Sequence, residues 1–141
     1  MGGDLYRRYR QTDISTRSSG QNLILIFDEC ISHLRQAATM FRATSSPEAP
    51  STHSGGRHIR KAQEILATLC SMLRDDVDPK LCRMLETYYL GTTQIITQAQ
   101  LDRDWRRLEG VTEQLKVIRS GWVQAVTMSE KEQKKPRIKH N

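Results

Sequence analysis

Histidines are the first residues to consider for chemistry, because pairs of them on helices commonly hold metals or move protons. The four in this sequence show neither an i, i+4 pair nor the Glu-x-x-His spacing used by metal sites in helical bundles. They are His33, His53, His58 and His140. We therefore expect exposed histidines, with no metal site and no cofactor.

Carboxylates and glycines give no catalytic pattern either. Asp75, Asp76 and Asp78 cluster just before Pro79, where acidic side chains favour the start of a helix. The pair Gly55-Gly56 lacks the spacing and the Lys-Ser/Thr ending of a phosphate-binding loop. The sequence thus predicts a protein that is not an enzyme and has no catalytic residue.

The cysteines indicate a reducing compartment. Cys30, Cys70 and Cys82 are odd in number, lack CxxC spacing and fall within helical apolar patterns, where cysteine behaves as a small hydrophobe. The charged N-terminus is followed by no apolar signal region, and the longest apolar run, Leu23 to Phe27, is too short to cross a bilayer. We expect a cytoplasmic protein without membrane insertion.

The net charge of +6 is concentrated at the two ends of the chain. Residues 1–19 contribute +2 and residues 130–141 contribute +3, which leaves about +1 for the long middle segment. Charged ends are typical of solvated tails, whereas a nucleic-acid site needs a basic face on the folded part. This distribution argues against a nucleic-acid partner.

Apolar residues recur at spacings of three and four, which predicts an all-α fold. Four amphipathic segments favour an antiparallel four-helix bundle with a flexible N-terminal arm and a basic C-terminal tail. Asp78-Pro79 is a strong helix-start signal for the third segment. The expected arm covers residues 1–17, the bundle 18–128 and the tail 129–141. The expected helices span about 19–43, 57–74, 79–98 and 102–127.

An ordered set of short motifs resembles the FliS family of flagellar export chaperones over about residues 9 to 124. The family pattern begins with a Tyr, an Ile and a Thr before a capped first helix, and continues with an aromatic-Asp pair, an Ala-Gln-x-Ile-Ile-x-x-Leu segment and a Leu-Arg-x-Ala-Trp ending. The matching residues are Tyr9, Ile14, Thr16, Ser18, Phe27-Asp28, Ala62-Gln63, Ile65-Leu66, Leu69, Leu85, Tyr89, Ile96, Ala99, Leu115, Ile118-Arg119 and Gly121-Trp122.

Four positions depart from this pattern. Ser19 stands where Pro is usual, Asn22 where Leu is usual, Glu29 in place of Gly, and Gly91 where a second aromatic residue is common. The partner-facing side of the first helix is therefore expected to differ from that of the family.

The resemblance implies a cytoplasmic chaperone that binds the C-terminal segment of flagellin, prevents premature polymerisation and assists export. Other flagellar export components are further candidate partners. We expect Asp28 to face solvent or to serve a cap, and Trp105 and Trp122 to be structural. Because adjacent helical residues point about 100° apart, Tyr88 and Tyr89 cannot both be central, so one of them is expected near the surface. The candidate partner-binding residues are Tyr9, Ile14, Ile65, Leu69, Tyr88 and Tyr89.

Two other functions are compatible with the same sequence. A helical chaperone for another exported protein is the nearer alternative, because an apolar groove does not identify its guest. A nucleic-acid-binding helical module that uses the basic ends is the other, and a steep salt dependence of binding would reveal it.

Overall fold

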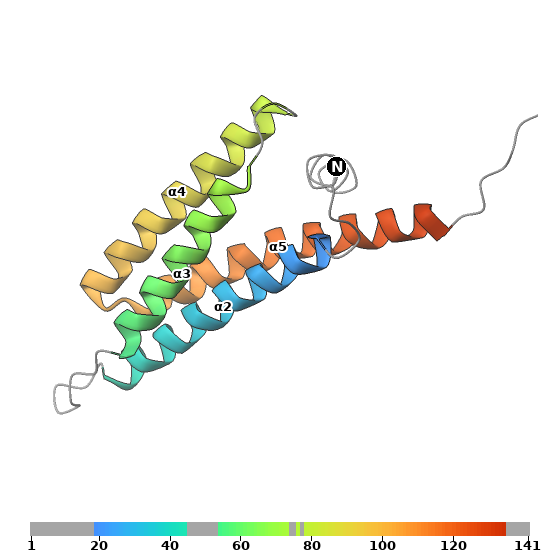
Figure 1. The fold of residues 1–141 in the computed structure, drawn as a ribbon. Helices are drawn as coiled ribbons and strands as arrows, with labels where there is room; N and C mark the ends of the chain where they lie inside the picture. Colours follow the sequence, from blue (N-terminus) through green and yellow to red (C-terminus); the bar gives the residue numbers. More distant parts are fainter. Residues whose placement is uncertain (1–18, 45–53, 74–75, 77, 135–141) are drawn as a thin grey trace, which may run out of the picture.

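The computed structural model describes residues 19–44, 54–73, 76 and 78–134. Within these residues the chain forms four α-helices and no strand, which confirms the all-α prediction (Figure 1). The helices are α2 (Ser19–Ala43), α3 (Ser54–Ser71), α4 (Pro79–Asp102) and α5 (Trp105–Lys134).

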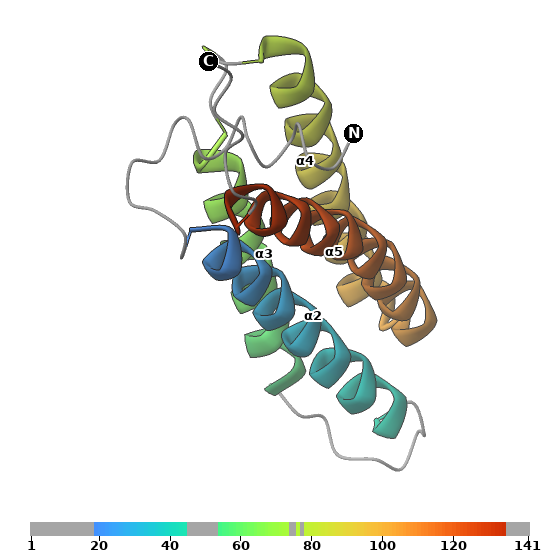
Figure 2. The ribbon, with the colours of Figure 1, turned by 90° about the vertical axis from the view of Figure 1, so that its right-hand side faces the viewer.

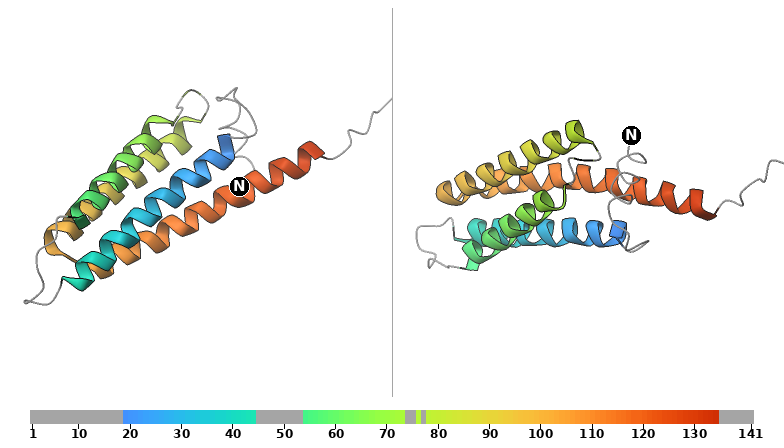
Figure 3. Two further views of the ribbon diagram at one scale, coloured as in Figure 1. Left: turned by 60° about the horizontal axis from the view of Figure 1, so that its bottom comes forward. Right: turned by 45° about the horizontal axis from the view of Figure 1, so that its top comes forward.

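Each helix packs against the next along the chain, and α5 returns to pack against α2. Figures 2 and 3 show α2 beside α5, and Figure 3 shows α3 beside α4. Asp28 in the first half of α2 pairs with Arg119 at the middle of α5, while Arg42 at the end of α2 stacks on Trp105 at the start of α5. These contacts run in opposite directions along the two helices, so the bundle is antiparallel.

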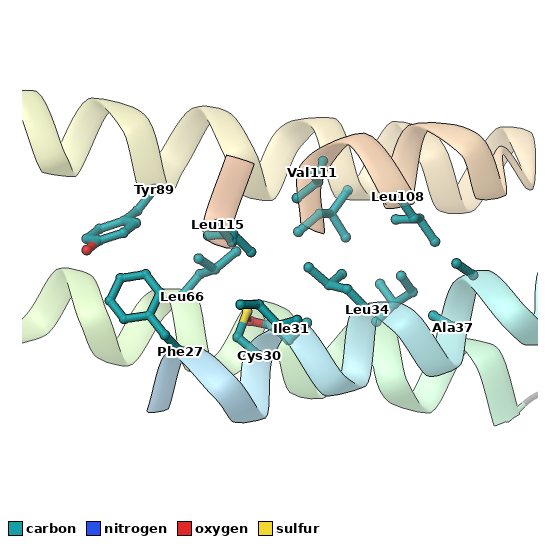
Figure 4. Close-up of a cluster of buried hydrophobic side chains, with 14 of the residues drawn as sticks. Phe27, Cys30, Ile31, Leu34, Ala37, Leu66, Tyr89, Leu108, Val111 and Leu115 are labelled. Atoms are coloured by element: carbon teal, nitrogen blue, oxygen red, sulfur yellow. Dashed lines mark hydrogen bonds between the residues drawn. The ribbon is translucent and has the colours of Figure 1, made fainter. Parts of the chain in front are cut away.

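A single main core is shared by all four helices (Figure 4). Phe27 and Leu34 of α2 meet Leu66 of α3, Tyr89 of α4 and Leu115 of α5 in this core, and all five are at most 2% exposed. Burying a side chain of this size stabilises the fold by about 1.5–3 kcal/mol. The core therefore holds the four helices together. A partner can bind only to side chains at the margin of this core or outside it.

Cys30 is a buried thiol within this core. Its side chain is fully buried, and its Sγ lies 3.7 Å from the backbone oxygen of Ala62 in α3. Burial raises the pKa of the Cys30 thiol to about 12. The thiol is therefore protonated at neutral pH and serves as packing.

The start of α4 confirms the prediction made from Asp78-Pro79. The Asp78 carboxylate accepts a hydrogen bond from the backbone N–H of Leu81 at 3.1 Å, and Pro79 occupies the first turn, where no intrahelical donor is needed.

The turn between α4 and α5 lies later in the sequence than predicted. We expected α4 to end near residue 98 and α5 to start near residue 102, but α4 continues to Asp102. Arg103 then adopts a left-handed conformation with φ 49°, and its backbone N–H bonds back to α4. Asp104, rather than Asp102, caps α5 by accepting a hydrogen bond from the backbone N–H of Arg107.

Three other helix boundaries also differ from the expectation. α3 spans Ser54–Ser71 instead of 57–74, because Gly55 packs inside the first turn against Phe41 and the last turn tightens after Ser71. α5 continues to Lys134 instead of ending near 127, so it includes the first residues of the expected tail. Glu, Lys and Gln are strong helix formers, and Glu130 accepts a hydrogen bond from Gln21 of α2.

Replacing either of two helical glycines by alanine should change the free energy of unfolding, in opposite directions for the two positions. A Cβ on Gly55 would lie 2.6 Å from the enclosed ring of Phe41, so Gly55→Ala should lower the free energy of unfolding by about 1 to 3 kcal/mol. A Cβ on Gly91 would meet no atom within 4 Å among the described residues, so Gly91→Ala should raise it by about 0.5 to 1 kcal/mol. Urea unfolding followed by circular dichroism measures both, and equal effects would contradict this account of α3.

Candidate partner-binding surface

Four of the six residues predicted for partner binding cannot be assigned to a surface. Leu69 and Tyr89 are 0% and 2% exposed, so in this conformation the core leaves them no surface for a guest. Tyr9 and Ile14 lie outside the described residues.

The other two, Ile65 and Tyr88, lie partly buried at the margin of the core. Tyr88 and Tyr89 meet edge to face, with ring centroids 5.8 Å apart, and only Tyr89 is enclosed. The Tyr88 hydroxyl is withdrawn from water, and burial raises the pKa of this phenol. Because Tyr89 is the enclosed ring and Tyr88 is only partly buried, Tyr88 is the tyrosine that lies nearer the surface.

Tyr88 belongs to a row of residues along one flank of α4. Gln63 of α3 donates hydrogen bonds to the Thr93 backbone oxygen and to Thr97 Oγ1, which places α3 against the opposite flank. The backbone of α4 comes close only to those of α3 and α5 among the described helices, so we place the Tyr88 row on the side of α5. Residues spaced i, i+4, i+7 and i+11 share such a flank. They are Met84, Tyr88, Gly91 and Ile95.

A matching row lies on α5, on the flank turned away from α2. The opposite flank of α5 carries Trp105 and Arg119, which contact α2. The row toward α4 includes partly buried Ile118 and Gly121, with exposed Val117 and Met128 beside it. A Cβ on Gly121 would meet no described atom within 4 Å, as for Gly91.

We call these two rows the α4–α5 seam: Met84, Tyr88, Gly91, Ile95, Ile118 and Gly121. It is the least closed of the four helix interfaces, and the α4 axis separates from α5 toward residue 79 (Figures 1 and 2). Met84 is 63% exposed at this wider end. The seam is thus a strip of apolar and small residues between two helices, which suits an apolar helix face.

Sequence reasoning missed Met84 and Gly121 as members of this seam. Met84 precedes Tyr88 by four residues, a spacing that could have placed both on one flank. Which neighbouring helix this flank borders depends on tertiary packing, so the spacing alone was not sufficient.

A hollow lies between α2 and α5, and several charged side chains line it. It has a volume of about 600 Å³ and is lined by both signs of charge, including Arg35, Glu109 and Glu113. Trp105 stands at its end, with the guanidinium carbons of Arg42 and Arg106 at 4.9 and 5.1 Å from the ring centroid. The stacked arginines cover this aromatic surface, so the hollow offers less apolar anchoring than the seam.

An ion pair brings together two parts of the sequence motif. Arg119 donates hydrogen bonds from Nε to Asp28 Oδ1 and from Nη2 to Asp28 Oδ2, the second at 3.2 Å. The bond to Asp28 raises the pKa of the Arg119 guanidinium. Asp28 is thus partly exposed, as expected, but it serves no cap: its carboxylate joins α2 to α5 across 91 sequence positions.

The expectation of scattered, exposed histidines is wrong for two of the four. His33 of α2 and His58 of α3 are partly buried and face each other with their Nδ1 atoms 2.8 Å apart. Within the part of the chain that the structure describes, no group of three or more His, Cys, Asp or Glu side chains could hold a metal ion. Among these same residues, no helix is both long and apolar enough to cross a bilayer.

The four helices define the chain as an antiparallel bundle in which the interface of α4 with α5 is the least extensive. The family model described as "Flagellar protein FliS" matches residues 2–129, and the chain belongs to this family. FliS proteins are chaperones of flagellar export and not enzymes. Neither the curated proteins nor the solved structures include a match to this chain.

Breaking the pair of Asp28 and Arg119 should reveal a coupling between α2 and α5. The two side chains are 44% and 34% exposed, so a double-mutant cycle of Asp28→Ala and Arg119→Ala should give a coupling of about 0.5 to 1 kcal/mol. Urea unfolding of the four proteins provides the energies.

The pair of Glu113 and Lys116 gives a matched control, because it lies within α5 and joins no helices. Its coupling should be smaller, because water and salt screen an exposed pair on one helix face. A coupling between Asp28 and Arg119 no larger than this control would show that the pair does not hold α2 and α5 together.

Proposed function

We propose that this protein binds the C-terminal segment of flagellin in the cytoplasm, keeps it from polymerising and delivers it for export. Membership of the FliS family is the observation that carries this proposal. The α4–α5 seam is the proposed docking surface for one helical part of the guest.

The dimensions and chemistry of the seam support this docking mode. Met84 and Ile95 are eleven residues apart, which corresponds to about 16 Å along α4, or three turns of a guest helix. An amphipathic helix binds such a strip through apolar residues spaced three and four apart. The small residues Gly91 and Gly121 leave room for guest side chains to approach the backbone.

The proposed mechanism is competition, with no bond made or broken. A disordered segment that becomes helical on the chaperone loses conformational entropy and gains buried apolar area, typically about 1,000 to 3,000 Å² in coupled folding. While it is bound, the segment is unavailable for packing between flagellin subunits. Other flagellar export components would then receive the complex.

The alternative of another exported guest is compatible with the same seam. A nucleic-acid partner is disfavoured because most of the net charge of +6 lies at the chain ends. Flagellin with and without its C-terminal segment distinguishes these possibilities. Retained binding to truncated flagellin would contradict the proposal.

Shortening Met84 should weaken flagellin binding. Met84→Ala removes an exposed apolar anchor at the wide end of the seam, and we expect a loss of about 1 to 2 kcal/mol in affinity for the flagellin C-terminal segment. Isothermal titration calorimetry measures this change. Leu90→Ala is the matched control, because Leu90 is 53% exposed on the same helix but on the other flank. If both variants bind equally well, the guest does not occupy the seam.

Tyr9 and Ile14 remain proposed contacts of the N-terminal arm, which we expect to shield the apolar groove while no guest is bound. If Tyr9 only shields, Tyr9→Ala should increase self-association of the empty chaperone and leave affinity equal or tighter. If Tyr9 also packs on the guest, affinity should fall by about 1 to 3 kcal/mol. Light scattering and calorimetry measure the two effects, and no change in either would contradict a role for the arm.

A further inference from the structure

The two facing histidines form a contact between α2 and α3 that the proposed function does not use. His33 Nδ1 and His58 Nδ1 are 2.8 Å apart, and the ring centroids are 5.1 Å apart. The centroid separation exceeds the nitrogen separation by about the two ring radii, so the two nitrogens point at each other. This arrangement is a head-on hydrogen bond.

Such a bond needs one proton between the two Nδ1 atoms. A neutral imidazole carries one N–H and one free lone pair, whereas a protonated imidazole carries N–H on both nitrogens. The contact therefore forms when one Nδ1 atom carries the proton and the other presents its lone pair. When both rings are charged, two N–H groups and two like charges meet at the same point.

The charged groups around the two rings differ. Glu29, one turn earlier on α2, has Oε1 at 4.0 Å from His33 Nε2. His58 lies near Arg57 and Lys61 on its own helix; burial, His33 and these two cations lower the pKa of His58.

Metal binding fits this geometry less well. A shared metal ion needs both lone pairs to converge on a third point, whereas these nitrogens are aimed at each other. Glu29 lies on the far side of the His33 ring, at Nε2, and cannot complete a site at Nδ1.

We propose that His33 and His58 form an acid-sensitive latch that holds α3 against α2 and opens when both imidazoles are protonated. The same interface of α2 with α3 includes the close approach of Gly55 to Phe41 and of Cys30 to Ala62. Acid thus acts on one interface of the bundle, whereas the contact of Asp28 with Arg119 joins α2 to α5 without a histidine.

The direction in which pH changes the stability of the fold follows from the lowered pKa of His58. Its pKa is lowered in the folded state relative to about 6.5 in the unfolded chain, so the unfolded state binds more protons in acid. The stabilisation is complete above about pH 6.5 and is lost as pH falls through the folded-state value. Each unit of lowering corresponds to about a tenfold fall in the folding equilibrium constant.

Asparagine variants test the latch because asparagine places an amide donor where histidine carries Nδ1, at a similar helix propensity. His33→Asn and His58→Asn should each retain stability at pH 8 but lose the extra acid sensitivity. Between pH 8 and pH 5, the folding constant of the wild type, measured by urea unfolding, should fall further than that of either variant. His140→Asn is the matched control, and it should behave as the wild type does.

Hydrogen exchange and the NMR chemical shifts of the imidazole nitrogens test the latch independently of urea unfolding. At pH 5, peptides covering residues 54–62 should exchange faster in the wild type than in His33→Asn, while peptides covering residues 105–122 should not differ. Equal acid sensitivity of wild type and both variants would overturn the latch. If a variant does not fold, wild-type nitrogen shifts decide: independent titration of His33 and His58 at ordinary histidine values would also overturn it.

Discussion

The bundle depends on the burial of one broad apolar stripe on α2 against two neighbours at once. α2 packs along both α3 and α5, and its Phe27, Cys30 and Leu34 are fully buried. Neither neighbour could cover this stripe alone, because a helix in contact with one partner leaves part of a wide apolar face in water. α4 completes the ring mainly through α3, so the interface between α4 and α5 is the one left least closed.

Polar contacts at the edges of the core join particular pairs of helices. Arg119 bonds Asp28 across α2 and α5, His33 bonds His58 across α2 and α3, and Gln63 bonds α4 from α3. Each is partly exposed and contributes little free energy compared with the core.

The sequence by itself determined the helices and their approximate limits. Apolar spacing of three and four identified all four, and Asp78-Pro79 fixed the start of α4, because capping and periodicity act within a few residues. The ordered motifs indicated the FliS family, which the match over residues 2–129 establishes. Helix ends were less certain: α5 continues to Lys134 because its polar residues are good helix formers and α2 supplies a contact at Glu130.

Only the tertiary structure decided which residues meet across helices. The contacts of Asp28 with Arg119 and of His33 with His58 join positions 91 and 25 residues apart, and no local spacing encodes them. Periodicity likewise showed that Tyr88 and Tyr89 point in different directions, but not that Tyr89 would be the enclosed one. Residue type and spacing fix one face of a helix, whereas the partner of that face depends on how all four apolar stripes are buried together.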